Sequence, residues 1–213
     1  MSENVVSDYG WTTAEGPPSL GYIWPRIVEI LRPLGVTRVL DLGAGNGALC
    51  GKLKSAGYQV TGVEFDKKGI EIARAAYPAI RFYNFGIQDD PAKLLADEAQ
   101  FDAVVSTEVI EHLFAPHLLP IYARAALKPK GYLVITTPYH GYLKNLVLTT
   151  LNKWDAHHMP LWHGGHIKFW SRRTLAMLLA ENGFRVIGFS GVGRVPYLWK
   201  SMVLLAQKET ERS

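Results

Sequence analysis

The chain has 213 residues, of which 48% are hydrophobic and 20% are charged, and its formal net charge is +4. This length and hydrophobic fraction suit a single domain over residues 1–213 with a sizeable core. The one cysteine, Cys50, excludes an internal disulfide, and no apolar run reaches the roughly 18 residues that a transmembrane helix needs. This positive charge permits contact with nucleic acid or an anionic membrane, but the basic residues are scattered rather than gathered in an arm, so the charge decides little; we do not expect a nucleic-acid partner. With no leader-like segment near the start, we expect a cytoplasmic protein.

Residues 1–20 are mostly polar and contain Gly16-Pro17-Pro18, which cannot continue a helix. We therefore expect a flexible arm over residues 1–20. An amphipathic helix is predicted next, from Tyr22 to Leu31, and Pro33 closes it.

An apolar run that begins at Arg38 ends in an acid and then in glycines at alternate positions. The pattern predicts a strand, a tight turn and the start of a helix. Glycine has no Cβ, so such a turn takes positive φ angles and brings bare backbone N–H groups against a ligand. The segment predicts a small-molecule cradle whose candidate contacts are Asp41, Gly43, Ala44, Gly45, Asn46 and Gly47.

Two cofactors compete for this cradle. Gly43-x-Gly45-x-x-Ala48 fits the dinucleotide fingerprint, and Glu64 ends the next predicted strand, where a ribose-binding acid belongs. Asp41 argues against a dinucleotide, because two like charges ~4 Å apart cost on the order of 4 kcal/mol at an intermediate dielectric. S-adenosylmethionine (SAM) carries an ammonium and a sulfonium in place of phosphates and keeps the ribose diol, so we favour SAM.

Helices and strands are predicted to alternate from here on. The expected segments are 48–56, 59–65, 67–77, 80–85, 101–108, 117–127 and 131–138. Alternation of this kind predicts a doubly wound, Rossmann-like α/β sheet. Its ligands lie at the carboxyl ends of the strands, so Asp41, Glu64, Phe65, residues 86–88 and Thr107 should converge on one crevice.

The chain ends in two predicted strands, 184–190 and 201–208, after a helix that Ser171 caps. No helix separates these strands, and a parallel pair would need a long crossover. We therefore predict a seven-stranded sheet, mostly parallel, with an antiparallel C-terminal edge strand.

Residues 139–169 do not follow the alternation and are rich in histidine and tryptophan. Loops of this length inside a domain are usually functional, so we predict a lid over the substrate side of the crevice. A short apolar helix is expected from Leu143 to Leu151. Beside Lys144 and Lys153, it would allow weak contact with a membrane surface.

Three chemically active residues follow the fourth predicted strand: Glu108, Glu111 and His112. At helical spacing they would share one face, where they could bind a metal or act as an acid–base pair. The alternative is a solvated helix start whose acids are stabilised by the helix dipole. Their position at a strand end favours a site.

Val39-Leu40-Asp41-Leu42-Gly43-Ala44-Gly45-Asn46-Gly47 resembles motif I of the class I SAM-dependent methyltransferases, and the likeness covers nearly the whole chain. The resemblance implies that Ile87 and Gln88 lie near the adenine. Glu108-x-x-Glu111-His112 with His166 resembles the residue set of the ubiquinone-biosynthesis O-methyltransferases, in which a divalent cation assists catechol methylation. The same residues are also similar to the metal set of bacterial RNA 3′-terminal 2′-O-methyltransferases, although this chain departs from that pattern at Tyr139-His140.

We therefore predict methyl transfer from SAM to an oxygen of a small, aromatic or lipophilic acceptor. His112 is the first candidate for the base and His166 the second, because a phenol with a pKa near ~10 must lose its proton. A divalent cation (Mg²⁺, Mn²⁺ or Zn²⁺) held by Glu108, Glu111, His112 and His166 is the alternative way to activate the acceptor. RNA 2′-O-methylation and a non-catalytic SAM-binding module remain competing functions.

Overall fold

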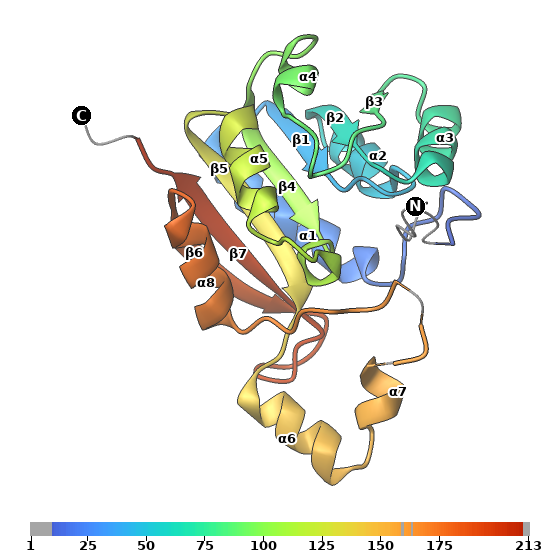
Figure 1. Cartoon of the computed structure of the whole chain (residues 1–213), viewed down its shortest axis with the longest axis vertical. Helices are drawn as coiled ribbons and strands as arrows, with labels where there is room; N and C mark the ends of the chain where they lie inside the picture. The colour runs from blue at the N-terminus through green and yellow to red at the C-terminus, as the bar shows by residue number, and fades with distance from the viewer. Residues whose placement is uncertain (1–9, 159, 163, 211–213) are drawn as a thin grey trace, which may run out of the picture.

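A computed structural model describes residues 10–158, 160–162 and 164–210, whose strands form one seven-stranded sheet with helices on both faces (Figure 1). The strands are β1 (Arg38–Leu42), β2 (Gln59–Val63), β3 (Arg81–Tyr83), β4 (Phe101–Thr107), β5 (Leu127–Pro138), β6 (Phe184–Val192) and β7 (Ser201–Lys208). The helices are α1 (Leu20–Leu31), α2 (Ala48–Ser55), α3 (Lys67–Ala76), α4 (Ala92–Leu95), α5 (Leu118–Ala126), α6 (Tyr142–Thr150), α7 (Trp154–His158) and α8 (Arg172–Glu181), with 3₁₀ turns η1 (Arg32–Leu34) and η2 (Ile110–His112). The predicted alternation is confirmed, whereas α4 and α7 were not expected.

The strand order is β3-β2-β1-β4-β5-β7-β6, and β7 runs antiparallel to both of its neighbours. The predicted fold class and the antiparallel last strand are confirmed. Within the terminal hairpin, however, β6 is the outermost strand. The apolar run Met202–Leu205 explains this placement, since a strand buried on both faces needs apolar side chains at successive positions.

Each face of the sheet has its own hydrophobic core. Helices α1, α2 and α3 cover one face, where Val39 of β1 is buried with Leu53 and Ile70. The other face carries α4, α5 and α8, and there Leu40 is buried with Tyr122. Successive residues of β1 therefore serve opposite cores, as the two-residue period of a strand requires.

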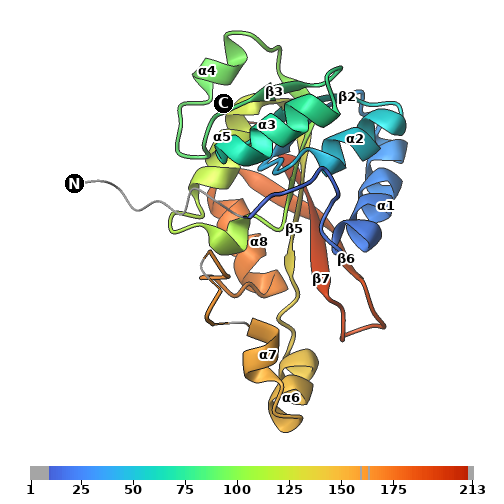
Figure 2. The same cartoon turned by 90° about the vertical axis from the view of Figure 1, so that its right-hand side faces the viewer.

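The helices α6 and α7 stand apart from these layers, beyond the carboxyl end of β5 (Figure 2). They belong to the segment 139–169 that was predicted to be a lid. The expected apolar helix is present as α6, shifted by one residue at each end.

Within the segment expected to be a flexible arm, Trp11, Thr13 and Glu15 contact the glycine turn that follows β1; residues 1–9 lie outside the described part of the chain. Asn46 Nδ2 donates to Thr13 O at 2.8 Å and to Glu15 O at 2.7 Å. The Trp11 ring lies against Gly45, so close that a Cβ there would come within 2.7 Å of it. One buried amide and one aromatic ring thus fix the segment.

We expect Asn46→Ala to release this segment, because two backbone carbonyls lose a buried donor. Loss of these bonds should lower the free energy of unfolding by about 1–3 kcal/mol and speed amide hydrogen exchange in residues 11–16. Asn182→Ala is the control, since Asn182 Nδ2 also donates to a backbone carbonyl, Leu178 O at 2.7 Å, far along the chain from the arm. Unchanged exchange in residues 11–16 of Asn46→Ala would contradict the assignment.

Candidate functional site

The carboxyl ends of β1, β2 and β4 meet at one edge of the sheet. Asp41 is level with Gly62 on one side and with Val105 on the other. The parallel register therefore brings Asp41, Glu64 and Thr107 to a common edge, as the sequence predicted. This convergence is the basis of the candidate site.

The glycine turn after β1 depends on its glycines. Gly43, Gly45 and Gly47 have φ angles of +88°, +53° and +79°. The N–H groups of Gly43 and Ala44 both donate to Val63 O at 2.9 Å, which ties the turn to the end of β2. A Cβ on Gly43 would come within 2.5 Å of Val109, so a side chain there is excluded by both backbone angle and space.

Asp41 is almost completely buried, with 1% of its surface exposed. Cys50 Sγ donates to its Oδ2 at 3.2 Å, while Oδ1 has no hydrogen-bond donor among the described residues. Burial raises the pKa of Asp41 to about 7. A buried carboxylate oxygen without a donor is unfavourable until a cationic or hydrogen-bonding partner arrives, so this position fits the ammonium of SAM.

Glu64 holds the turn from the other side. Its Oε2 accepts from Gly45 N at 2.7 Å, and its Oε1 accepts from Phe65 N at 2.9 Å and from Asp66 N at 2.8 Å. Burial raises the pKa of Glu64, although these three N–H groups oppose the rise. Because each carboxylate oxygen has a further lone pair, Glu64 can also accept from a ribose hydroxyl.

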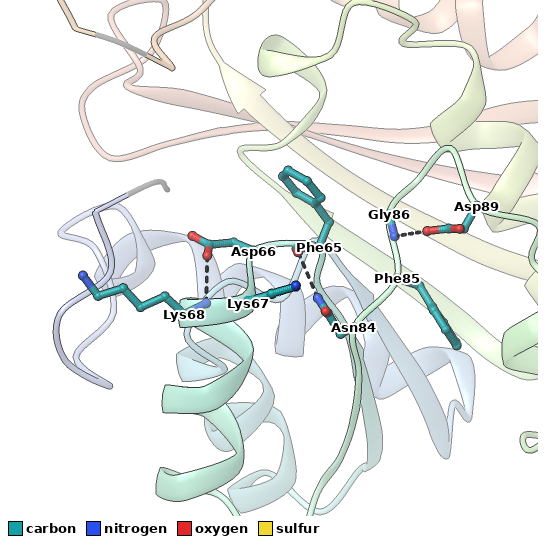
Figure 3. A pocket seen from close by; sticks show the side chains of 8 residues that line it. All are labelled: Phe65, Asp66, Lys67, Lys68, Asn84, Phe85, Gly86 and Asp89. Atoms are coloured by element: carbon teal, nitrogen blue, oxygen red, sulfur yellow. Dashed lines mark hydrogen bonds between the residues drawn. The ribbon is translucent and has the colours of Figure 1, made fainter. Parts of the chain in front are cut away.

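A cavity of about 510 Å³ opens beside Glu64, between the segment after β2 and the segment after β3 (Figure 3). It is lined by Phe65, Asp66, Lys67, Lys68, Asn84, Phe85, Gly86 and Asp89. Asn84 Nδ2 closes its floor by donating to Glu64 O and Phe65 O at 2.9 Å each. Phe65, an aromatic side chain next to an acid that can accept from a ribose hydroxyl, makes this cavity suitable for binding a nucleoside.

The two residues expected near the adenine lie beside this cavity rather than in its lining. Ile87 packs against the hydrophobic core and Gln88 is exposed. Gly86 and Asp89 line the cavity instead, joined by a 2.7 Å hydrogen bond from Gly86 N to Asp89 Oδ2. The sequence analysis missed Asn84 and Asp89, although polar residues directly after a predicted strand are a usable signal.

Glu108 does not share a helical face with Glu111 and His112, so that expectation is wrong. Its φ of +53° turns the chain before η2 begins. Its carboxylate accepts from Thr136 Oγ1 at 2.8 Å and from Ser201 Oγ at 3.1 Å, and therefore faces β5 and β7.

Three of the four predicted metal ligands do lie together. Ligand atoms of Glu111, His112 and His166 are within 4.8 Å of one another. Glu111 Oε2 accepts from Thr137 Oγ1 at 3.0 Å, and Oε1 has no donor in the described part of the chain. One carboxylate and two imidazoles form a donor set for a divalent cation.

The protonation states suit either a ligand or a base. A carbonyl only accepts, so His112 Nδ1 donates to Gly164 O at 2.8 Å, and the neutral ring then has its lone pair on Nε2. Burial lowers the pKa of His112, and burial with the nearby His112 charge lowers that of His166 to about 4. Burial raises the pKa of Glu111, and the neighbouring Glu108 carboxylate adds to the rise. Both histidines are therefore neutral at pH 7.

The other lid histidines form a separate cluster. The His140 ring centroid lies 5.6 Å from that of His158 and 6.4 Å from that of His157, and Phe169 packs on the same group. This cluster agrees with a structural role in the lid. His163 lies outside the described residues.

Comparison with known proteins identifies the family. A family model of a methyltransferase domain matches residues 20–188. The ubiquinone biosynthesis O-methyltransferase of Bradyrhizobium diazoefficiens is 34% identical over 197 residues, which cover 85% of this chain and 74% of that protein. Proteins of the same name from Bartonella tribocorum and Maricaulis maris are 26% and 32% identical, over 76% and 50% of this chain and 66% and 42% of those proteins.

Solved structures share the fold. The magnesium protoporphyrin IX methyltransferase of Synechocystis, with bound S-adenosylhomocysteine (SAH), has a TM-score of 0.64 at 19% identity, covering 87% of this chain and 82% of that chain. The 1,6-didemethyltoxoflavin-N1-methyltransferase of Burkholderia thailandensis, also with SAH, has a TM-score of 0.63 at 20% identity and covers 87% and 77%.

The family match over most of the chain decides between the two cofactors that the glycine turn left open. It shows that the chain belongs to the class I SAM-dependent methyltransferases, as a distant relative of the ubiquinone-biosynthesis O-methyltransferases.

Proposed function

We propose that this enzyme methylates an oxygen of a small, aromatic or lipophilic acceptor. The observation that carries the proposal is the half-buried, neutral His112, whose Nδ1 donates to Gly164 O and whose ring lies beside Glu111 and His166. An O–H acceptor needs a group of this kind to take its proton. The relatives are named O-methyltransferases, which also supports oxygen as the atom that is methylated.

In this mechanism the protein positions the acceptor and removes a proton. SAM supplies a methyl group on a sulfonium, which is a good leaving group, so in-line alignment does most of the work. Asp41 holds the ammonium, Glu64 the ribose hydroxyls, and the cavity beside Phe65 the adenine. His112 Nε2 accepts the hydroxyl proton, and Gly164 O stabilises the resulting imidazolium through Nδ1.

A divalent cation (Mg²⁺, Mn²⁺ or Zn²⁺) held by Glu111, His112 and His166 is part of the proposal as an alternative activator. The buried Glu111 Oε1, which no described residue supplies with a hydrogen-bond donor, fits such an ion. When bound, the cation would lower the pKa of the acceptor hydroxyl. Glu108 could bind the same cation only if its carboxylate gave up its hydrogen bonds with Thr136 and Ser201.

We also propose that the lid touches a membrane surface, as a lipophilic acceptor would require. Large apolar side chains of the lid are exposed, among them Tyr142, Leu151 and Leu161, the last with 92% of its surface exposed. None of the described helices is both long and apolar enough to cross a membrane.

The acceptor class is tested by incorporation of labelled methyl groups from SAM into a cell extract. We expect label in small organic-soluble products, unchanged by prior nuclease treatment and absent with Asp41→Asn. Label that disappears with nuclease would favour RNA as the acceptor. No transfer to either fraction would favour a SAM-binding module.

Calorimetry should show that SAH binds and that NAD does not. We expect Asp41→Ala and Glu64→Ala each to weaken SAH binding by ~1–3 kcal/mol, the range for a hydrogen bond to a charged group. Glu71→Ala, which removes an exposed acid of α3, is the matched control.

The same titration should depend on pH. With a pKa of about 7, Asp41 becomes protonated as the pH falls through 7 and loses its attraction for the ammonium. Affinity should therefore fall by about tenfold per pH unit below 7, since one proton must be displaced. Asp41→Asn should remove this dependence; tight NAD binding or a flat wild-type profile would contradict the assignment.

The metal is tested by chelation and by direct binding. If the cation is used, excess EDTA should abolish activity, divalent cation should restore it, and His166→Ala should raise the concentration required. In equilibrium dialysis Glu111→Gln should lose the ion, whereas Glu108→Gln should keep it, because only Glu111 lies with the two histidines. Full activity in EDTA would leave His112 as the base.

A further inference from the structure

Helix α6 differs from an ordinary surface helix, because its lysine is buried and several of its apolar side chains are exposed. Its single buried residue is Lys144, with 5% of its surface exposed, while the apolar Tyr142 has 83% and Leu143 has 46% exposed. A lysine on a surface helix normally keeps its ammonium in water. Helix α6 therefore turns its one lysine inward, toward the body of the enzyme.

The Lys144 ammonium is poorly satisfied there. It donates one long hydrogen bond, 3.4 Å to Lys200 O. Across the part of the chain that the structure describes, no carboxylate forms an ion pair with it. Glu108 is the acid that interacts electrostatically with Lys144. Its carboxylate, however, accepts hydrogen bonds from Thr136 and Ser201 rather than from the ammonium. A buried ammonium without a close counter-ion is destabilising.

A second cationic side chain, Arg194, acts on Lys144. Arg194 repels it, and burial together with this repulsion lowers the pKa of Lys144 to about 8. The Lys144 charge in turn acts on His140, His157 and His166. Since His166 belongs to the group of candidate metal ligands, this positive region adjoins the proposed site of methyl transfer.

We propose that Lys144 binds an anionic group, a carboxylate or a phosphate ester, carried by the methyl acceptor itself. The proposal rests on the proposed function and adds to it the charge of the acceptor. An anion would give Lys144 the charge-assisted hydrogen bond that it lacks, in a partly dry position where such bonds are strong. Arg194, which is exposed, would add attraction from the β6–β7 turn.

The test compares matched small probes by calorimetry on the SAH-loaded enzyme. Catechol and 3,4-dihydroxybenzoate differ by one carboxylate, and phenol and phenyl phosphate differ by one phosphate. We expect the anionic member of at least one pair to bind at least tenfold more tightly than its neutral partner. The pair that shows the difference identifies which anion the site takes.

Lys144→Met keeps the length and apolar stem of the side chain but removes its charge. We expect it to lose at least tenfold in affinity for the anionic probe, to bind the neutral probe within twofold of wild type, and to melt at the same or a higher temperature. Arg194→Met should lose two- to fivefold. Lys153→Met, which removes an exposed lysine of the same lid, should change neither affinity.

Two results would overturn the proposal: equal binding of neutral and anionic probes by the wild type, or equal loss of both probes in Lys144→Met. The second result would mean that Lys144 serves only to neutralise Glu108. Methyl label that disappears with nuclease in the extract assay would instead overturn the proposed function, so the two failures are distinguishable.

Discussion

The structure of the site depends on the burial of carboxylates at one edge of the sheet. Asp41 lies near the end of β1, Glu64 directly follows β2, and Glu111 lies in η2, beyond the end of β4; all three are buried. The backbone N–H groups of Gly45, Phe65 and Asp66 donate to Glu64, and Thr137 donates to one oxygen of Glu111. Asp41 and Glu111 each keep one oxygen that has no donor among the described residues, and the proposed mechanism places cationic partners there: the ammonium of the cofactor and a divalent ion.

The fold and the cofactor half of the site could be predicted from the sequence because local rules determine them. Alternate glycines need positive φ, and strands that alternate with helices must be parallel, which brings Asp41 and Glu64 together. The interior position of β7 could also have been predicted, because the uninterrupted apolar run from Met202 to Leu205 is typical of a strand that is buried on both faces. The edge-strand expectation followed chain order and overlooked that run.

The catalytic half of the site was less predictable, because residues far apart in the sequence determine where its side chains point. The backbone of Glu108 turns at a positive φ that its spacing from Glu111 does not reveal, and its carboxylate is held by Ser201, 93 residues away. Helix α6 is a similar case. Its apolar composition predicts a helix, but only the packed structure shows that Lys144 is the residue that faces inward.

The lid and the candidate base are parts of one hydrogen-bonded unit. Ile167 N and Lys168 N donate to Glu111 O at 2.9 Å and 3.0 Å, while Gly164 O accepts from His112 Nδ1. The returning segment of the lid therefore fixes η2 and sets which nitrogen of His112 carries the proton. A movement that opened this segment would break the hydrogen bond from His112 Nδ1 to Gly164 O, which holds the imidazole in that tautomer. In the proposed mechanism, therefore, His112 is set up as the base while this segment lies against η2.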